Sequence, residues 1–148
     1  MRFKNIRARA AKRKGSDANL VKLLPKVSSQ QTLKTLGNDR YLAMMTKVVN
    51  QAGFNWKVIE NKWPEFEEAF FGFDPEKLAL VSPEQWEGYL SDRRVVRNGQ
   101  KINALQKNLF FVLEISREYG SFGGFVAGWP SSDQIGLMEY LKKHGGRL

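Results

Sequence analysis

The chain has 148 residues, and 42% of them are apolar, which is enough for one compact domain with its own core. Cysteine is absent and histidine occurs once, which excludes disulfides, thiolate catalysis and the Cys or His clusters that hold zinc, so no metal site is expected. The longest uninterrupted apolar run, Leu109 to Leu113, is far shorter than the roughly 18 residues of a membrane span. We therefore expect a soluble protein with no membrane partner.

The N-terminal segment, residues 1–14, is strongly basic. It contains seven Lys and Arg residues and no acid, which leaves only +2 of the formal charge of +9 for the rest of the chain. Such a segment is typical of a phosphate-binding terminus, and equally of a solubilising or disordered one. Its composition overlaps with mitochondrial transit peptides but lacks their serine, and it has no apolar signal region, so a cytoplasmic location is expected. We separate it from a helical domain over residues 15–148.

Helix signals dominate from residue 16 onward. Ser16 or Asp17 can cap a short helix that Pro25 ends, and a second short helix is expected over residues 32–36. A longer helix then begins at Asn38 or Asp39 and ends at Gly53. Its apolar residues recur at spacings of four, three and four: Tyr41, Met45, Val48 and Ala52.

The next elements are short and have clear starts. Trp56, Ile59 and Trp63 fit one helical face, and Pro64 suits the first turn of a following helix. Another helix opens at the Asp74-Pro75 step. The residues Ser82-Pro83-Glu84-Gln85 match a capping box, in which the serine hydroxyl and the glutamine amide satisfy each other's backbone donors.

The longest helix follows Asn98-Gly99 and runs for about five turns. One face of it carries Ile102, Leu105, Leu109, Val112, Ser116 and Tyr119. The glycine-rich residues 120–128 are expected to form a packed turn, and a last helix, capped by Ser132 or Asp133, runs to Lys143 before Gly145. Since no segment of comparable length alternates with period two, the predicted fold is all-α, a helical bundle without a sheet.

Three features that could suggest a catalytic or phosphate-binding site have ordinary structural explanations. The acids of residues 65–76 fit exposed faces and helix first turns, His144 fits a basic helix C-terminus, and the glycine-rich stretch lacks the Gly-Lys-Ser/Thr ending of a phosphate loop. A fourth feature is a cluster that is local and free of acids, and it indicates either a solvated face or a phosphate-binding surface. It consists of Arg93, Arg94, Arg97 and Lys101.

The segment Gln51-Ala52-Gly53-Phe54-Asn55-Trp56 places two amides, a bulky apolar side chain and an indole around a glycine bend between helices. Amides can read a base edge, and aromatic faces can stack on a base. The alternative is a packed helix corner.

With its surroundings, this segment resembles the DNA-3-methyladenine glycosylase I family of helix-hairpin-helix glycosylases. The Gln-Ala-Gly-x-x-Trp motif stands at Gln51 to Trp56 and is followed by Phe66, Phe70 and Phe73-Asp74-Pro75 at the family's spacing. Residues 95–104, Val-Val-Arg-Asn-Gly-Gln-Lys-Ile-Asn-Ala, look like the family's Ile-Ile-Arg-x-x-x-Lys-Ile-x-Ala segment. The resemblance covers roughly residues 38 to 148.

The resemblance implies a base-excision repair enzyme that bends double-stranded DNA, flips an alkylated base such as 3-methyladenine into an aromatic pocket and hydrolyses its N-glycosidic bond. It implies a monomer that needs no cofactor. A cationic lesion is already a good leaving group, so cation–π attraction serves in place of strong acid catalysis. The implied base-binding residues are Trp56, Gln51 and Asn55. The implied DNA-binding residues are Gly53, Phe54, Arg97, Lys101, Lys143, Gly145 and Gly146.

The chain also departs from the family's pattern. Val48 stands where the family has a pocket glutamate, so no catalytic residue is assigned. The zinc-binding Cys and His residues and the aromatic-rich N-terminal segment of the family are missing, and residues 142–148 look like the first helix and glycines of the DNA-binding hairpin without its second helix. We therefore expect a C-terminally truncated member. The alternatives are a non-catalytic helical DNA-binding module and a protein-interaction domain.

Overall fold

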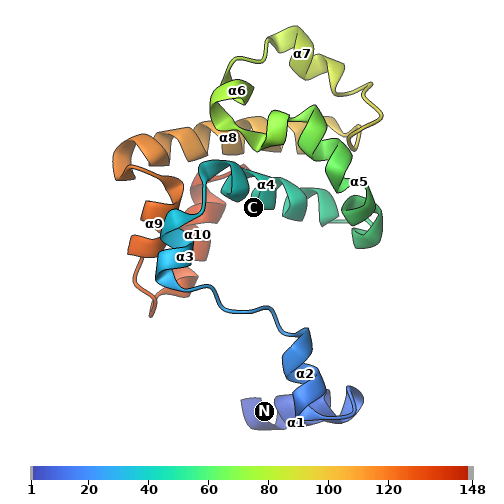
Figure 1. The fold of residues 1–148 in the computed structure, drawn as a ribbon, viewed down its shortest axis with the longest axis vertical. Helices are drawn as coiled ribbons and strands as arrows, with labels where there is room; N and C mark the ends of the chain where they lie inside the picture. The colour runs from blue at the N-terminus through green and yellow to red at the C-terminus, as the bar shows by residue number, and fades with distance from the viewer. Residues whose placement is uncertain (1, 147–148) are drawn as a thin grey trace.

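The computed structural model describes residues 2–146, and these residues form helices and connecting segments without a strand (Figure 1). The all-α prediction is therefore confirmed. Met1 of the basic segment and the predicted hairpin residues Arg147 and Leu148 lie outside the described residues. In chain order the elements are α1 (Phe3–Arg13), α2 (Asp17–Leu23), α3 (Gln30–Thr35), α4 (Asn38–Gln51), α5 (Trp56–Ala69), the 3-10 helix η1 (Phe71–Phe73), α6 (Pro75–Ala79), α7 (Pro83–Gly88), α8 (Gly99–Tyr119), α9 (Phe122–Gly128) and α10 (Gln134–His144).

The core lies between α4 and α8, which make the most extensive contact between two helices. Leu42 of α4 and Val112 of α8 are fully buried there, and Phe66, Phe70 and Phe73 close the core from the side of α5 and η1. In Figure 1, α5, α6 and α7 cover one side of this pair, while α3, α9 and α10 gather at one end of it. The two central helices therefore fix the position of every segment that carries a candidate site residue.

The long helix α8 buries the predicted face over most of its length. Ile102, Leu105, Leu109 and Val112 are buried, but Tyr119 is half exposed, because the last turn of α8 extends past the core. Asn108 is fully buried within this apolar face, and its side-chain amide is hydrogen-bonded. The predicted helix is correct in its limits, and its predicted face is buried from Ile102 to Val112, half-buried at Ser116 and exposed at Tyr119.

Pro64 corrects one predicted boundary. It lies inside α5, which continues from Trp56 to Ala69. A proline here removes one backbone donor, and the carbonyl that loses it belongs to Glu60 on the exposed side of the helix, where water can replace the bond. Trp63, the preceding residue, stacks on Phe66 and Phe73 with ring centroids 5.4 and 5.3 Å apart, and this packing favours a continuous helix.

Most helix starts follow the predicted caps. Ser82 and Gln85 form the capping box, and Asp74 and Asn98 accept backbone bonds at the starts of α6 and α8. Asn38 is different: Gly37 occupies the cap position of α4, and the Asn38 side chain accepts from the backbone nitrogen of Phe122 at 2.9 Å. Asn38 was predicted as a helix cap, and in the structure its side chain instead joins α4 to α9.

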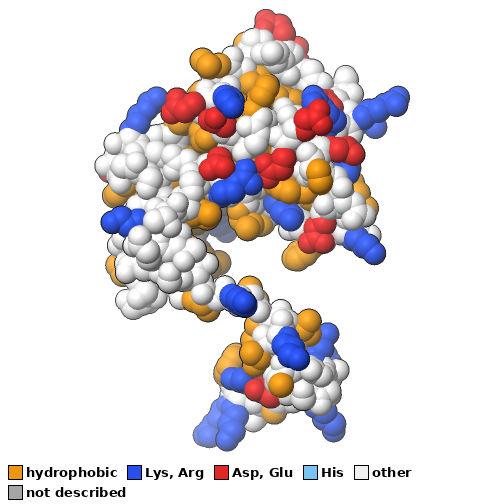
Figure 2. All heavy atoms as spheres, viewed as in Figure 1, with side chains coloured by type: hydrophobic (Ala, Val, Ile, Leu, Met, Phe, Trp, Pro, Cys, Tyr) orange, Lys and Arg blue, Asp and Glu red, His pale blue; other side chains and the backbone are white. Residues whose placement is uncertain are grey.

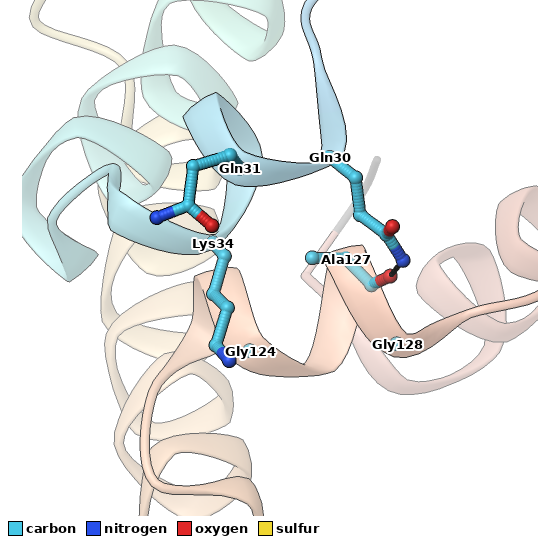
Figure 3. A pocket seen from close by; sticks show the side chains of 6 residues that line it. All are labelled: Gln30, Gln31, Lys34, Gly124, Ala127 and Gly128. Carbon is cyan, nitrogen blue, oxygen red and sulfur yellow. Dashed lines mark hydrogen bonds between the residues drawn. The ribbon is translucent and has the colours of Figure 1, made fainter.

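The glycine-rich stretch contains a helix, α9 (Phe122–Gly128), where a turn was expected. Ser121 caps it by accepting from the Gly124 nitrogen. Gly123 lets α9 pack directly on α3, because a Cβ there would lie 2.5 Å from the carbonyl oxygen of Leu33. Figure 3 shows the Gln30 amide reaching from α3 to the carbonyl oxygen of Ala127, a hydrogen bond of 2.7 Å, beside a cavity of about 390 Å³.

The basic segment also forms regular structure, although no helix was expected before residue 16. Its alanines, arginines and lysines are good helix formers, and α1 takes up residues 3–13. In Figures 1 and 2, α1 and α2 form a small lobe apart from the other helices, joined to α3 by an extended segment. Among the described residues, no helix combines the length and the apolar character that a membrane span requires.

Candidate base-recognition and DNA-binding site

The corner between α4 and α5 presents two aromatic side chains to solvent. α4 ends at Gln51, Gly53 turns the chain with a φ of 68°, and Asn55 caps α5 by accepting from the Lys57 nitrogen at 3.0 Å. The Phe54 side chain is 46% exposed and the Trp56 side chain 66% exposed. The alternative of a packed helix corner is therefore wrong, because exposed aromatic side chains of this size are free to stack on a ligand.

An apolar strip on α4 leads into this corner. Met44 and Val48 are both more than half exposed, and Gln51 follows one turn later on the same side of the helix. Val48, where the resemblance implies a glutamate, therefore presents an isopropyl group toward solvent. It offers neither a hydrogen-bond acceptor nor a negative charge.

Lys101 of α8 holds the corner from behind. Its ammonium donates to the carbonyl oxygens of Asn50, at 2.8 Å, and Ala52, at 3.0 Å, and lies 5.4 Å from the centre of the Phe54 ring. The carbonyls at the C-terminus of a helix lack partners within the helix, and a cation there is favoured by the helix dipole. Partial burial lowers the pKa of the Lys101 ammonium. Lys101 thus positions the corner, and its hydrogen bonds go to protein atoms.

The arginine cluster divides into paired and exposed members. Arg94 makes ion pairs with Asp92, at 2.7 Å, and with Glu68, at 3.1 Å, and the hydrogen bonds from Arg94 lower the pKa of Asp92. Arg93 and Arg97 are exposed. Their side chains are the members of the cluster that can reach a phosphate.

The structure brings Arg97 and Phe54 together, although they are 43 positions apart in the sequence. Both line a cavity of about 540 Å³, whose other walls come from α5 and from the segment before α8. Lys62 of α5 closes one edge by donating to the carbonyl oxygen of Arg93 at 2.7 Å. The remaining lining residues are Val58, Val95 and Val96.

The glycines after α10 are tied to α8. The Gly146 nitrogen donates to Asn108 Oδ1 at 2.6 Å, and Asn108 Nδ2 donates to the Gly146 carbonyl oxygen at 3.2 Å. Gly146 is buried, Gly145 is half-buried and Lys143 is exposed. The resemblance assigns Gly146 to DNA binding, but its backbone N–H already donates to a side chain of the protein.

Lys101 and Asn108 place the corner and the glycines on one side of α8. The two residues are seven positions apart, which is about two helical turns, so they point in nearly the same direction roughly 10 Å apart along the axis. Sequence reasoning missed Asn108. A polar residue inside the apolar face of α8 was the available signal.

A second cavity has a different lining. The cavity between α3 and α9 in Figure 3 is lined by none of the residues predicted to bind the base or DNA. Within residues 2–146, no three His, Asp or Glu side chains come close enough together to hold a metal ion.

Comparison with known proteins places these residues in a family. A family model described as methyladenine glycosylase matches residues 33–143. DNA-3-methyladenine glycosylase of Haemophilus influenzae is 28% identical to this chain and DNA-3-methyladenine glycosylase 1 of Escherichia coli is 30% identical. Each alignment spans 76 residues, which is 51% of this chain and 41% of the relative.

The fold leads to the same relatives. The structure of 3-methyladenine DNA glycosylase I from Staphylococcus aureus, solved to explain 3-methyladenine recognition, matches with a TM-score of 0.63 at 26% identity. The match covers 75% of this chain and 69% of that structure. Because the family model matches most of the chain and includes both the corner and α8, the protein belongs to the methyladenine glycosylase family.

Proposed function

We propose that this protein excises 3-methyladenine from double-stranded DNA, with the exposed α4–α5 corner as its base-recognition element. The observation that carries the proposal is the exposure of Phe54 and Trp56 on a corner held by Lys101, in a chain of this family. A helix corner that serves packing alone would bury such side chains. We also propose that the chain acts as a monomer in the cytoplasm.

Each residue of the corner has a proposed role. Trp56 stacks on the flipped base, and Phe54, carried past Gly53, fills the gap that the base leaves in the duplex. Gln51 faces the same side as Val48 and is proposed to contact a base edge. The Asn55 Oδ1 atom already caps α5, so its Nδ2 group is the one proposed to donate to the base.

The remaining proposed contacts are with the DNA backbone. Arg97 at the edge of the cavity and Lys143 at the end of α10 are exposed cations suited to phosphates. Gly145 and Gly146 are proposed to lie along the strand, with the Gly146 amide exchanging Asn108 for a phosphate oxygen when DNA binds.

The proposed reaction suits a site without a strong acid. A base methylated at N3 is cationic, so it leaves with the electron pair of the C1′–N9 bond and becomes neutral. Water adds to C1′ and releases one proton to solvent. An aromatic face stabilises the cationic base before cleavage. The reaction as written requires no cofactor.

The test is release of 3-methyladenine from methylated duplex DNA, measured by chromatography with Trp56→Ala and Trp56→Phe beside the unaltered chain. Base stacking is worth about 1–3 kcal/mol, so Trp56→Ala should lower release roughly 5- to 150-fold and Trp56→Phe less. Tyr119→Ala is the control, since Tyr119 is similarly exposed and lies about 27 Å from Lys101 along α8. Equal release by Trp56→Ala and the control would contradict the proposal.

A second candidate function rests on Val48. A site whose α4 wall is apolar suits a non-catalytic module that binds DNA and does not cleave the glycosidic bond. Binding to duplex DNA containing an abasic-site analogue, with no base released from methylated DNA over many hours, would favour this candidate over the enzyme.

A further inference from the structure

The charge of this chain is divided unequally between two parts. Residues 1–37 contain ten Lys and Arg residues and one Asp, so they carry a formal charge of +9, the whole net charge of the protein. Residues 38–148 contain fourteen bases and fourteen acids. The helices that hold the base-recognition corner are therefore neutral overall, and a neutral body gains little from the general attraction of a polyanion.

Most of the positive charge lies on a small helical hairpin, residues 2–24, which we name the basic arm. α1 ends in a turn at Gly15, whose φ is 87°, and α2 begins at Asp17. Two hydrogen bonds from Arg7 to the carboxylate of Asp17, at 2.9 and 2.8 Å, join the two helices. The one acid of the arm is therefore neutralised by a partner in the arm.

The arm stands apart from the body of the protein. No residue of α1 or α2 is buried, and the extended residues 24–29 connect the hairpin to α3 (Figure 1). In Figure 2 this lobe shows Lys and Arg side chains on several of its sides. An exposed, basic lobe on a short connection is free to contact a partner while the corner contacts another part of it.

The cations of α1 suit the phosphates of a duplex. Lys4, Arg9 and Lys12 point to one half of the helix circumference, and Phe3 and Ile6 point to the other. α1 is about 16 Å long, and duplex DNA carries one negative charge per ~1.7 Å of its axis, so several phosphates lie within the length of the helix.

The apolar side chains of the arm favour DNA over a membrane surface. A helix that lies in a lipid interface presents its large apolar side chains on one face. The half of α1 that carries Phe3 and Ile6 also carries Arg7 and Arg13, so its apolar side chains are interrupted by cations. In α2 the exposed side chains of Val21 and Leu23 are two positions apart and point to nearly opposite sides. The property that the arm presents on most of its surface is positive charge.

We propose that the basic arm is a tether that binds the phosphates of duplex DNA independently of the base-recognition corner, and that it supplies most of the electrostatic attraction between this protein and DNA. The tether deepens the proposed function, since its partner is the same DNA. It requires no damaged base. The arm raises the local concentration of duplex at the corner, so it acts on substrate affinity and leaves the cleavage step unchanged.

The experiment measures binding of the full chain to an undamaged 20-base-pair duplex across a range of KCl concentrations. The arm variant is Lys4→Gln/Arg9→Gln/Lys12→Gln. The matched control, Lys77→Gln/Lys107→Gln/Arg117→Gln, removes the same charge from the body. Circular dichroism and thermal melting establish that both variants fold. Vesicles of anionic phospholipid are a second probe.

The arm variant should lower the slope of log K against log[salt] by about 2.7, since each phosphate contact contributes about 0.9, and weaken binding at 0.1 M salt at least about tenfold. The control should keep the slope of the unaltered chain. Equal slopes for the two variants, or binding of the unaltered chain to vesicles and not to the duplex, would overturn the tether.

Base release separates the tether from the proposed function. On methylated duplex the arm variant should raise KM and leave kcat unchanged. If no version of the chain releases a base but the salt slope still depends on the arm, the tether stands and the glycosylase proposal fails. If release depends on Trp56 but neither the slope nor KM depends on the arm, the tether fails alone.

Discussion

The Lys101 ammonium lies 2.8 Å from the carbonyl oxygen of Asn50, so a side chain of α8 completes the last turn of α4. The resemblance implied that Lys101 contacts DNA, and its place in a basic cluster agreed with that role. Its position gives it a structural role, because the same ammonium also donates to the carbonyl oxygen of Ala52, immediately before Gly53. The corner is thus supported by a residue that sits 45 positions beyond Trp56 in the sequence.

Replacing Lys101 with methionine should lower both stability and DNA affinity. The change keeps the length of the side chain and removes the donor, and hydrogen bonds to charged groups contribute about 1.5–3 kcal/mol. Urea unfolding measures the loss, with Lys107→Met as the control on the same helix. If Lys101 served only as a phosphate contact, Lys101→Met would keep full stability and lose about 0.9 of the salt slope.

Gly146→Ala should loosen the end of α10. A Cβ at this position would lie 2.7 Å from the Cβ of Lys107 and 2.8 Å from the carbonyl oxygen of Ala104, so the chain must move away from Asn108. Overpacking of this kind costs about 1–3 kcal/mol. Thermal melting is the measurement. Gly88→Ala is the control, because nothing lies within 4 Å of a Cβ there, and equal melting temperatures would contradict the expected strain.

Val48→Glu should increase base release if the protein is a glycosylase. A carboxylate on the exposed face of α4 could stabilise the positive charge of the reacting nucleoside, and electrostatic groups of this kind contribute about 10²- to 10⁴-fold. Little change in stability is expected at an exposed helical position. A glutamine side chain has nearly the shape of glutamate without its charge, so Val48→Gln is the control. A similar increase in base release from both variants would attribute the effect to size alone.

The segment before α8 should become less stable in acid. The hydrogen bonds from Arg94 lower the pKa of Asp92 below the unfolded value of about 3.9. The ion pair therefore stabilises the fold above that value, and its contribution disappears as the pH falls through the folded pKa. Asp92→Asn should cost up to about 1 kcal/mol at pH 7 and progressively less as the pH falls through the folded pKa of Asp92. A pH-independent difference in unfolding free energy would exclude the carboxylate as its source.

The sequence predicted those parts of the fold that depend on neighbouring residues. The caps at Asp74, Ser82 and Asn98 are local features, and each satisfies donors within three residues. The continuation of α5 through Pro64 depends on aromatic stacking with η1, and a local rule for proline does not include such packing.

The candidate site shows the same division. The composition of residues 51–56 indicated an aromatic corner, but periodicity placed Trp56 on one face with Ile59 and Trp63, and only the fold shows it exposed. The pairing of Asn108 with Gly146 joins positions 38 apart, so no local pattern could have predicted it. The resemblance supplied the residue types of the site, and tertiary contacts determine which atoms of those residues remain available.

The anchoring of Gln30 to Ala127 fixes the point from which residues 24–29 extend. Six extended residues reach at most about 20 Å, which corresponds to about six base pairs of duplex at 3.4 Å each. With its point of attachment fixed, the hairpin can reach only the DNA within that distance plus its own length of about 16 Å. The number of residues between Leu23 and Gln30 therefore limits how far along the double helix the phosphates bound by the arm can lie from the damaged base.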